Sequence, residues 1–276
     1  MTISVRNTLL TTLAGISGIV LVLFLWFAYR VTQMSVDLEA MNLLTESRAL
    51  FWTVTGRPGS TPWRLGALAS LGVLSLAGQL VILRLFRRTS SATMLFLALF
   101  LVSLILDLGK VGYLFFLSQG MTPMRLVILS RTIRFGYFFG LFALLASSLY
   151  HAGVDYPKTG SVALVMGVVT ASLVYMLPVD SLSLEPHLVH GAGAQNSLRM
   201  VETALGLIVV ANGVLGALQR PESRLWLVSL AFASLVAGRE LVFFLPNPEL
   251  TFLGLGLLGA GTALAIYRTR KLVLWQ

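Results

Sequence analysis

The sequence contains no cysteine and has few charged residues. Without cysteine there are no disulfide bonds, no thiolate metal ligands and no cysteine nucleophile. Charged residues make up only 11% of the 276 residues, whereas about a quarter is usual for a soluble domain. Hydrophobic residues make up 57%, so the chain has too little polar surface to face water on all sides. We therefore expect an integral membrane protein.

Motifs of the common hydrolases and phosphoryl-transfer enzymes are also missing. The sequence has no G-x-S-x-G, H-E-x-x-H, Walker A or paired-aspartate pattern. Gly254, Gly256 and Gly259 do spell G-x-G-x-x-G, but they lie inside an apolar run with no strand before them, which excludes a dinucleotide site. We expect no catalytic residue and no cofactor, and an enzyme is the less favoured class.

One short polar string has the composition of a metal site. Glu185, His187 and His190 form E-x-H-x-x-H between two apolar runs, and imidazoles with a carboxylate can hold zinc. Pro186 and the glycines after His190 indicate a loop rather than a helix that would present these side chains on one face. We expect a surface loop without a metal.

Apolar runs long enough to cross a membrane recur along the chain. A hydrocarbon core about 30 Å thick requires about 20 residues of helix. Arg6 precedes the first run as in a signal peptide, but no small-residue cleavage site follows, so we interpret this run as a retained anchor. The predicted fold class is all-α, a polytopic transmembrane helix bundle of about eight spans. The runs lie at 8–30, 65–84, 92–118, 123–150, 161–178, 198–218, 225–245 and 249–268.

The distribution of lysine and arginine predicts the orientation. In an eight-span arrangement one side carries compact basic clusters, while the arginines of the opposite side are spread over longer loops and helix ends. Because cytoplasmic loops are enriched in lysine and arginine, we expect the clustered side and both termini to be cytoplasmic, in a bacterial-type inner membrane. The basic surplus is then a topology signal, and we expect no nucleic acid partner. The clustered residues are Arg6, Arg84, Arg87, Arg88, Lys158, Arg220, Arg224, Arg268, Arg270 and Lys271.

We expect a single integral membrane domain over 1–276, and an internal duplication is one interpretation of it. Segments 1–150 and 161–276 each contain four apolar runs, and the third run of each carries a similar pattern, with Gly109-Lys110 in one and Gly238-Arg239 in the other. A 4+4 helix repeat would explain this, as in several transporter folds. The spacings differ, and apolar helices resemble each other by composition, so both interpretations remain open.

Two further segments allow structural predictions. Segment 31–64 is expected to be an outside connector, in which Met34, Leu38 and Met41 have the spacing of a short amphipathic helix. A connector lying on the membrane surface is favoured over a partner contact there. In the last run, Gly256, Ala260 and Ala263 form a small-residue face suited to close helix contact.

Ionisable residues inside the apolar runs are the most informative feature for function. Such groups are costly in hydrocarbon and usually face the protein interior, a partner charge or water. Four runs carry a pair of them, and in three pairs the i,i+3 spacing places both side chains on one helical face. We expect all four pairs in the outer half of the bilayer or near its midplane. The pairs are Asp107 with Lys110, Arg131 with Arg134, Arg199 with Glu202, and Arg239 with Glu240.

The signs of these charges do not balance. Five basic residues face three acidic ones, which leaves two positive charges without partners, and an unpaired buried charge is heavily penalised. All eight residues are therefore candidates for an anion-binding pocket. In a structural alternative, the carboxylates pair with some bases and the other arginines extend to the interface or bind backbone carbonyls. A proton or ion relay through the three carboxylates is a third interpretation.

We therefore predict a receptor-like or accessory protein that binds an anionic small molecule or a lipid head group. The layout resembles the membrane sensing modules of bacterial receptors, on architecture alone. The chain ends a few residues after its last run, so sensing would require a membrane or cytoplasmic signalling partner. A secondary transporter of an organic anion is the alternative, and a membrane-embedded lipid-modifying enzyme is the third hypothesis.

Overall fold

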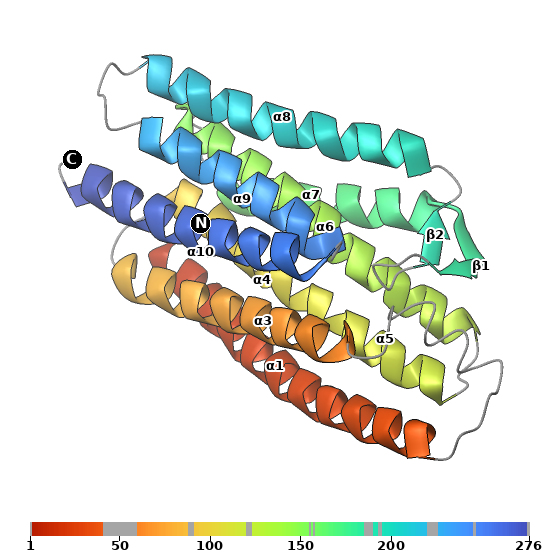
Figure 1. The fold of residues 1–276 in the computed structure, drawn as a ribbon. Coiled ribbons are helices and arrows are strands. Elements are labelled where there is room, and N and C mark those ends of the chain that lie inside the picture. The colour runs from red at the N-terminus through yellow and green to blue at the C-terminus, as the bar shows by residue number, and fades with distance from the viewer. Residues whose placement is uncertain are drawn as a thin grey trace.

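The protein is a bundle of long helices that run along one common direction (Figure 1). The computed structural model describes residues 2–40, 60–87, 91–119, 123–154, 156, 158–184, 190–192, 195–219, 226–244 and 247–274. In this part of the chain, eight helical spans are long and apolar enough to cross a membrane. The prediction of eight membrane-spanning helices is confirmed on length and composition.

The first four spans follow the predicted runs, with one interruption. The third run is two α-helices joined by a 3₁₀ turn, whereas the other three runs are continuous. These elements are α1 (Ile3–Ala40), α3 (Ser60–Leu85), α4 (Ala92–Ile105), η1 (Leu106–Leu108), α5 (Gly109–Ser118) and α6 (Pro123–His151).

The second four spans are all continuous helices, and the fifth run, which is diluted by glycine and threonine, is one of them. A short antiparallel pair of strands follows this helix. The elements are α7 (Thr159–Met176), β1 (Val179–Leu184), β2 (His190–Ala192), α8 (Gln195–Gln219), α9 (Trp226–Phe244) and α10 (Pro248–Leu274).

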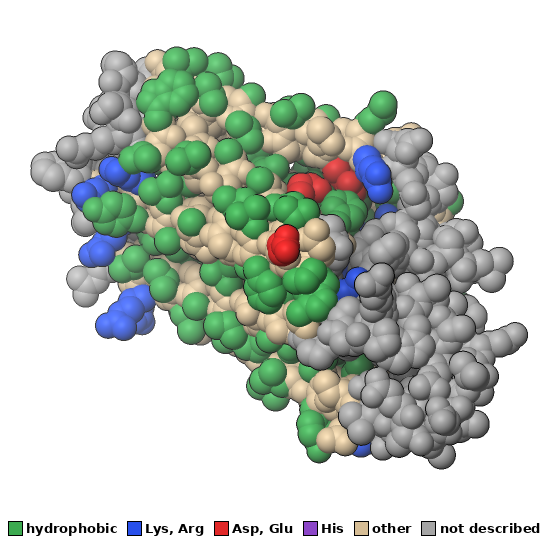
Figure 2. Space-filling view, in the orientation of Figure 1, with side chains coloured by type: hydrophobic (Ala, Val, Ile, Leu, Met, Phe, Trp, Pro, Cys, Tyr) green, Lys and Arg blue, Asp and Glu red, His purple; other side chains and the backbone are tan. Residues whose placement is uncertain are grey.

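Burial is concentrated in α4 and α6, and apolar side chains cover the outside of the bundle. Phe96, Phe100 and Leu104 of α4 are fully buried, whereas Val22 of α1 and Leu164 of α7 are each 66% exposed. Figure 2 shows many hydrophobic side chains on the visible flank of the helices. Exposed apolar surface on this scale is unfavourable in water and favourable in lipid. The arrangement supports an integral membrane protein.

The helices of the two halves pack in a similar order. In the first half α3 packs on α4 and α4 on α6, and in the second half α8 packs on α9 and α9 on α10. Across the halves, α3 contacts α10 while α8 contacts α6. The outermost helices differ, because α1 packs on α3 whereas α7 packs on α6. The 4+4 repeat stays a prediction.

The two strands form a hairpin where the sequence indicated only a loop. Strand β1 pairs with β2 with an irregular register between Asp180 and Leu184, and β1 contacts α6. His190 lies in β2, while Glu185 and His187 are outside the described residues. No cluster of three potential metal ligands occurs in the described ranges. The all-α class therefore holds for the membrane-spanning part, and the hairpin is the exception.

The two ends of the bundle differ in charge. Helix α1 begins and α10 ends at the same end of the molecule, and the β1–β2 hairpin lies at the other end (Figure 1). Among the described residues, Arg84, Arg87, Lys158, Arg270 and Lys271 are exposed at the end that carries the termini, and Arg30, Arg125 and Arg199 are exposed toward the hairpin end; Figure 2 shows basic side chains at both ends. The predicted outside connector begins as a helical continuation of α1 to Ala40, and its residues 41–59 are outside the described ranges.

Candidate functional site

An ion pair buried between the third and seventh spans is the centre of the candidate site. Asp107 lies in the 3₁₀ turn η1, and Arg239 lies on α9. The guanidinium donates from Nη1 to Oδ2 of Asp107 and from Nη2 to Oδ1, the latter over 3.3 Å. Neither side chain is more than 1% exposed. A two-point pair of this kind fixes both position and orientation of the helices that carry it.

Lys110 does not take part in this ion pair and instead binds the C-terminal end of helix α9. Its Nζ donates to the carbonyl oxygen of Phe243 and lies 4.1 Å from the centre of the Phe243 ring. Helix α9 ends at Phe244, so this carbonyl is one of those that an α-helix leaves without an internal donor. A cation there also compensates the negative end of the helix dipole. The fully buried Lys110 thus acts as a C-terminal cap across the bundle.

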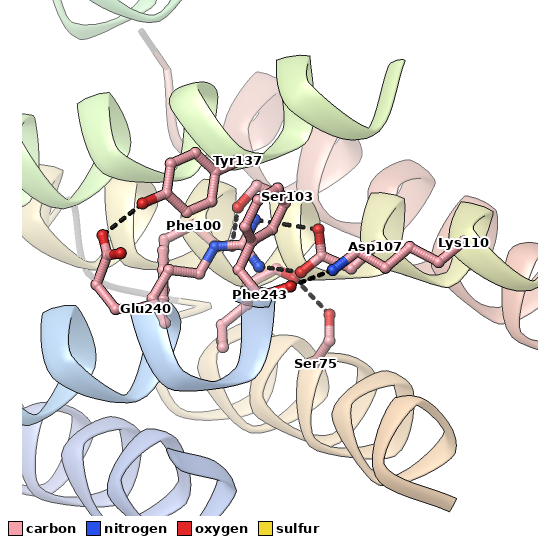
Figure 3. A network of polar contacts seen from close by, with 10 residues as sticks. Ser75, Phe100, Ser103, Asp107, Lys110, Tyr137, Glu240 and Phe243 are labelled. Carbon is pink, nitrogen blue, oxygen red and sulfur yellow. Dashed lines mark hydrogen bonds and ion pairs between the residues drawn. The ribbon is translucent and has the colours of Figure 1, made fainter. Parts of the chain in front are cut away.

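A tyrosine connects α6 to the same region. The hydroxyl of Tyr137 donates to Oε1 of Glu240, and its ring centre lies 4.1 Å from that of Phe243 (Figure 3). The guanidinium carbon of Arg239 lies 5.3 Å from the Tyr137 ring. The Tyr137 ring therefore covers the ion pair on the α6 side, while its hydroxyl donates to the neighbouring carboxylate of Glu240.

These five residues form one cluster, which we call the ionic core: Asp107, Lys110, Tyr137, Arg239 and Glu240. It holds two acidic and two basic side chains, so its formal charge is balanced. Its basic groups already bind a carboxylate and a backbone carbonyl within the protein. The predicted positive surplus therefore does not lie in the ionic core.

The other four predicted residues differ in burial. Arg134 and Glu202 are each only 8% exposed, Arg131 is half-buried and Arg199 is exposed. The expectation that Arg199 and Glu202 share one inward face is wrong. Residues three apart on an α-helix still differ by about 60° around its axis, so the edge of a buried face can pass between them. In this pair Glu202 lies on the buried side of that edge and Arg199 on the exposed side.

Arg131 lies beside the exposed end of α7. Its guanidinium carbon is 5.0 Å from the ring centre of Tyr175, a side chain that is 75% exposed. Its Nε is buried and has no hydrogen-bond partner within the described part of the chain. Helix α7 ends at Met176, so Tyr175 and the Arg131 that contacts it are at the level of the last turn of α7. On its own helix, α6, Arg131 lies about 12 Å from the first residue, Pro123.

Three helices reach the level of Arg131 together. Ile133 of α6, Val174 of α7 and Leu198 of α8 belong to one packed cluster. In the sequence, Ile133 precedes Arg134, Val174 precedes Tyr175 and Leu198 precedes Arg199. We call Arg131, Arg134, Tyr175, Arg199 and Glu202 the outer rim, because all five lie on α6, α7 or α8 in the half of the bundle that is nearer the hairpin (Figure 1).

No protein-family model matches the sequence, and no curated protein matches it. Sequence reasoning identified every charged member of the ionic core and of the outer rim. It did not identify the Phe243 carbonyl as the acceptor for Lys110, or Tyr175 as the partner of Arg131. The position of Tyr175, three residues before the proline that closes the fifth run, was the only available signal for the second of these contacts.

Proposed function

We propose that this chain is a receptor-like or accessory integral membrane protein that binds an anionic small molecule or a lipid head group at the outer rim. The observation that carries the proposal is the environment of Arg131. Its guanidinium stacks on an exposed tyrosine at the apolar surface, and its buried Nε has no acceptor among the described residues. A charge in this position is stabilised by an anion that supplies the missing acceptor.

Arginine is well suited to this role. Its planar group offers a fork of donors that matches a carboxylate or a phosphate, and it stacks on aromatic rings at the same time. Arg199, exposed and one helical turn from the start of α8, adds a second positive group at the hairpin end of the bundle. Glu202, three residues later on α8 and buried, favours ligands with few negative charges, because like charges repel.

The ionic core has a supporting role in this proposal. Asp107, Lys110, Arg239 and Glu240 are engaged with protein groups, and Tyr137 connects them to α6. Tyr137 lies six residues after Arg131 on the same helix. The ionic core thus holds α6 in place relative to α9 and positions the arginines without touching the ligand.

The experiment is a thermal unfolding series in detergent with inorganic phosphate, succinate and phosphatidylglycerol. A ligand that binds only the folded state raises Tm with its concentration. We expect at least one of these anions to stabilise the parent protein and the Arg84→Gln/Arg87→Gln control. The Arg131→Gln/Arg199→Gln variant should fold and lose the response. If no anion raises Tm, or if the rim variant responds as the parent does, the proposal is refuted.

An organic-anion transporter is the second candidate, favoured by the location of the ionic core. The core joins η1 and α5 of the first half to α9 of the second half, and the third span is interrupted there by the 3₁₀ turn. Transporters built from repeats place their substrate and ion sites at the interface of the halves, near interrupted helices. Accumulation of radiolabelled succinate in proteoliposomes, set against protein-free vesicles, distinguishes transport from binding. The third hypothesis, a lipid-modifying enzyme, remains a prediction.

A further inference from the structure

We infer that the ligand of the outer rim is an anionic lipid of the outer leaflet, whose acyl chain lies along the seam between α6 and α7. This inference rests on the proposed function, because it assigns the anion at Arg131 to the head group of an amphiphile. It adds a second region of contact that a small soluble anion would not use.

The seam begins at Arg131 and continues as an aromatic stripe on α6. Phe135, Phe139 and Phe142 follow Arg131 at intervals of four, four and three residues, which keeps them on one side of the helix. All three rings are half-buried, and those of Phe135 and Phe139 stack with their centres 5.5 Å apart. From Arg131 to Phe142 the helix rises about 16 Å, close to the thickness of one hydrocarbon leaflet, about 15 Å.

The stripe leads to an apolar groove. The groove has a volume of about 440 Å³ and lies between Phe142 of α6 and the first turns of α7. Val165 and Val169 on its lining are 56% and 45% exposed, so the groove is open to the surrounding hydrocarbon. Its lining residues are Phe142, Tyr156, Ser161, Val162, Val165, Met166 and Val169.

The charged end and the apolar groove lie on the same pair of helices. Tyr175, which stacks with Arg131, is six residues after Val169 on α7, a rise of about 9 Å. An acyl chain attached to a head group at Arg131 would follow the stripe for about the thickness of one leaflet and reach the near end of the groove, at Phe142 and Val169. The rest of the groove, with Tyr156 and Ser161, continues toward the end of the bundle that carries the termini. Helix α7 packs on α6, and its opposite side carries exposed Leu164 and Val168, so the seam is accessible sideways from the membrane.

An anionic head group is selected over a zwitterionic one by charge. Arg131 has a buried donor with no acceptor among the described residues, and both Arg131 and Arg199 are positive. The phosphate group of phosphatidylglycerol supplies an acceptor to Arg131, and this head group has a net negative charge. A phosphatidylcholine head group would bring its own cation to the same surface, where like charges repel.

The experiment is native mass spectrometry of the full chain, titrated in detergent with phosphatidylglycerol or phosphatidylcholine of identical acyl chains. Val165→Trp fills the groove, and Val168→Trp is its matched control, because Val168 is equally exposed on α7 but does not line the groove. Arg131→Gln removes the head-group contact, and Arg84→Gln is the control for charge. The soluble analogue glycerol phosphate is titrated in parallel by thermal unfolding.

We expect the parent protein to retain phosphatidylglycerol in preference to phosphatidylcholine. Arg131→Gln should weaken phosphatidylglycerol binding about fivefold, as expected for the loss of one basic group at a membrane surface. Val165→Trp should weaken the binding of both lipids, and the two controls should match the parent.

Equal lipid binding by Val165→Trp and Val168→Trp overturns the lipid assignment. If glycerol phosphate then stabilises the parent and not Arg131→Gln, the outer rim remains an anion site for soluble ligands. If the parent and Arg131→Gln bind phosphatidylglycerol equally well and also respond equally to glycerol phosphate, both proposals are refuted.

Discussion

Single residues determine how much charge the centre of the bundle can hold. Asp107 and Arg239 are buried, and each is the other's neutralising partner. Removing one charge leaves the other in an environment without water, which is far more costly than removing both. The stability of the ionic core is therefore a property of the pair.

The first prediction concerns this pair. Asp107→Asn should lower the free energy of unfolding by about 3–5 kcal/mol, because Arg239 keeps its charge without a counter-charge. The double variant Asp107→Leu/Arg239→Met, which removes both charges, should be more stable than Asp107→Asn alone. Unfolding in mixed detergent micelles with increasing dodecyl sulfate measures both. Equal stability of Asp107→Asn and the parent would contradict the pairing.

The second prediction concerns the hydrogen bond from Tyr137. Tyr137→Phe keeps the ring and removes the hydroxyl that donates to Glu240, so about 1–3 kcal/mol of unfolding free energy should be lost. The matched control is Tyr175→Phe, whose ring is 75% exposed; its stability should change by less than about 0.5 kcal/mol. The same unfolding assay applies. A Tyr137→Phe variant as stable as the control would show that this bond contributes nothing.

The sequence was sufficient to find the charges at this scale, but not their partners. Charge within an apolar run is visible in the sequence, which is why all eight residues could be named. The acceptor for Lys110 is a backbone carbonyl on another helix, and every residue has such a group, so no sequence signal distinguishes Phe243. The positive surplus was assigned to a shared pocket, whereas Arg199 is exposed and Arg131 is half-buried beside Tyr175.

At the scale of helices, close packing depends on glycines that face a neighbouring backbone. A Cβ added at Gly238 of α9 would lie 2.7 Å from the carbonyl oxygen of Gly254 on α10. At Gly167 of α7 the same atom would meet nothing within 4 Å. The α9–α10 contact therefore requires glycine at 238, whereas the surface of α7 does not require it at 167.

The third prediction follows from this contrast. Gly238→Ala should force α9 and α10 apart and lower the free energy of unfolding by about 1–3 kcal/mol. Gly167→Ala should be neutral or slightly stabilising, because alanine has the higher helix propensity and the position is open. Unfolding in mixed micelles compares the two. A Gly238→Ala protein as stable as Gly167→Ala would show that the close approach is unimportant.

The position of each span was predictable because membrane thickness sets a minimum length for an apolar run, but the full length of the helices was not, since α1 continues to Ala40 and α10 to Leu274. The interruption at η1 was not predictable, since Leu106–Leu108 is as apolar as its surroundings apart from Asp107. Leu106 lies close to Gly136 of α6, and the sequence gives no sign of this contact between helices. The small-residue face predicted for α10 was misplaced. Gly256, Ala260 and Ala263 are exposed, while Gly254 and Gly261 make the close contacts with α9. Composition identifies small residues, but not which side of a helix meets its neighbour.

At the scale of the whole molecule, the unequal ends of the bundle predict its orientation. Among the described residues, exposed arginines and lysines are more numerous at the end that carries the termini (Arg84, Arg87, Lys158, Arg270 and Lys271) than toward the hairpin (Arg30, Arg125 and Arg199) (Figure 1). Cytoplasmic loops of membrane proteins are the basic ones. The outer rim would then face the outside, where the proposed ligand would reach it.

The fourth prediction tests this orientation, and the absence of native cysteine makes it simple. Ser197→Cys, at an exposed position in the first turn of α8 beside the hairpin, should react with a membrane-impermeant maleimide in intact cells. Arg87→Cys, at the basic end, should react only after the membrane is permeabilised. Labelling is measured by the mass shift of the purified protein. The reverse pattern would place the outer rim in the cytoplasm and contradict the proposed access of the ligand.

The most direct test of the central claim is the stabilisation by phosphatidylglycerol of a series at one position, Arg131, Arg131→Lys and Arg131→Gln. At a ligand concentration about 100 times Kd, binding should stabilise the parent by about 2.7 kcal/mol, measured as a rise in Tm. Arg131→Lys keeps the charge but loses the planar fork, so it should retain part of this shift, and Arg131→Gln should retain least. Equal shifts in all three proteins would show that the anion does not bind at Arg131, and the account of the outer rim would be wrong.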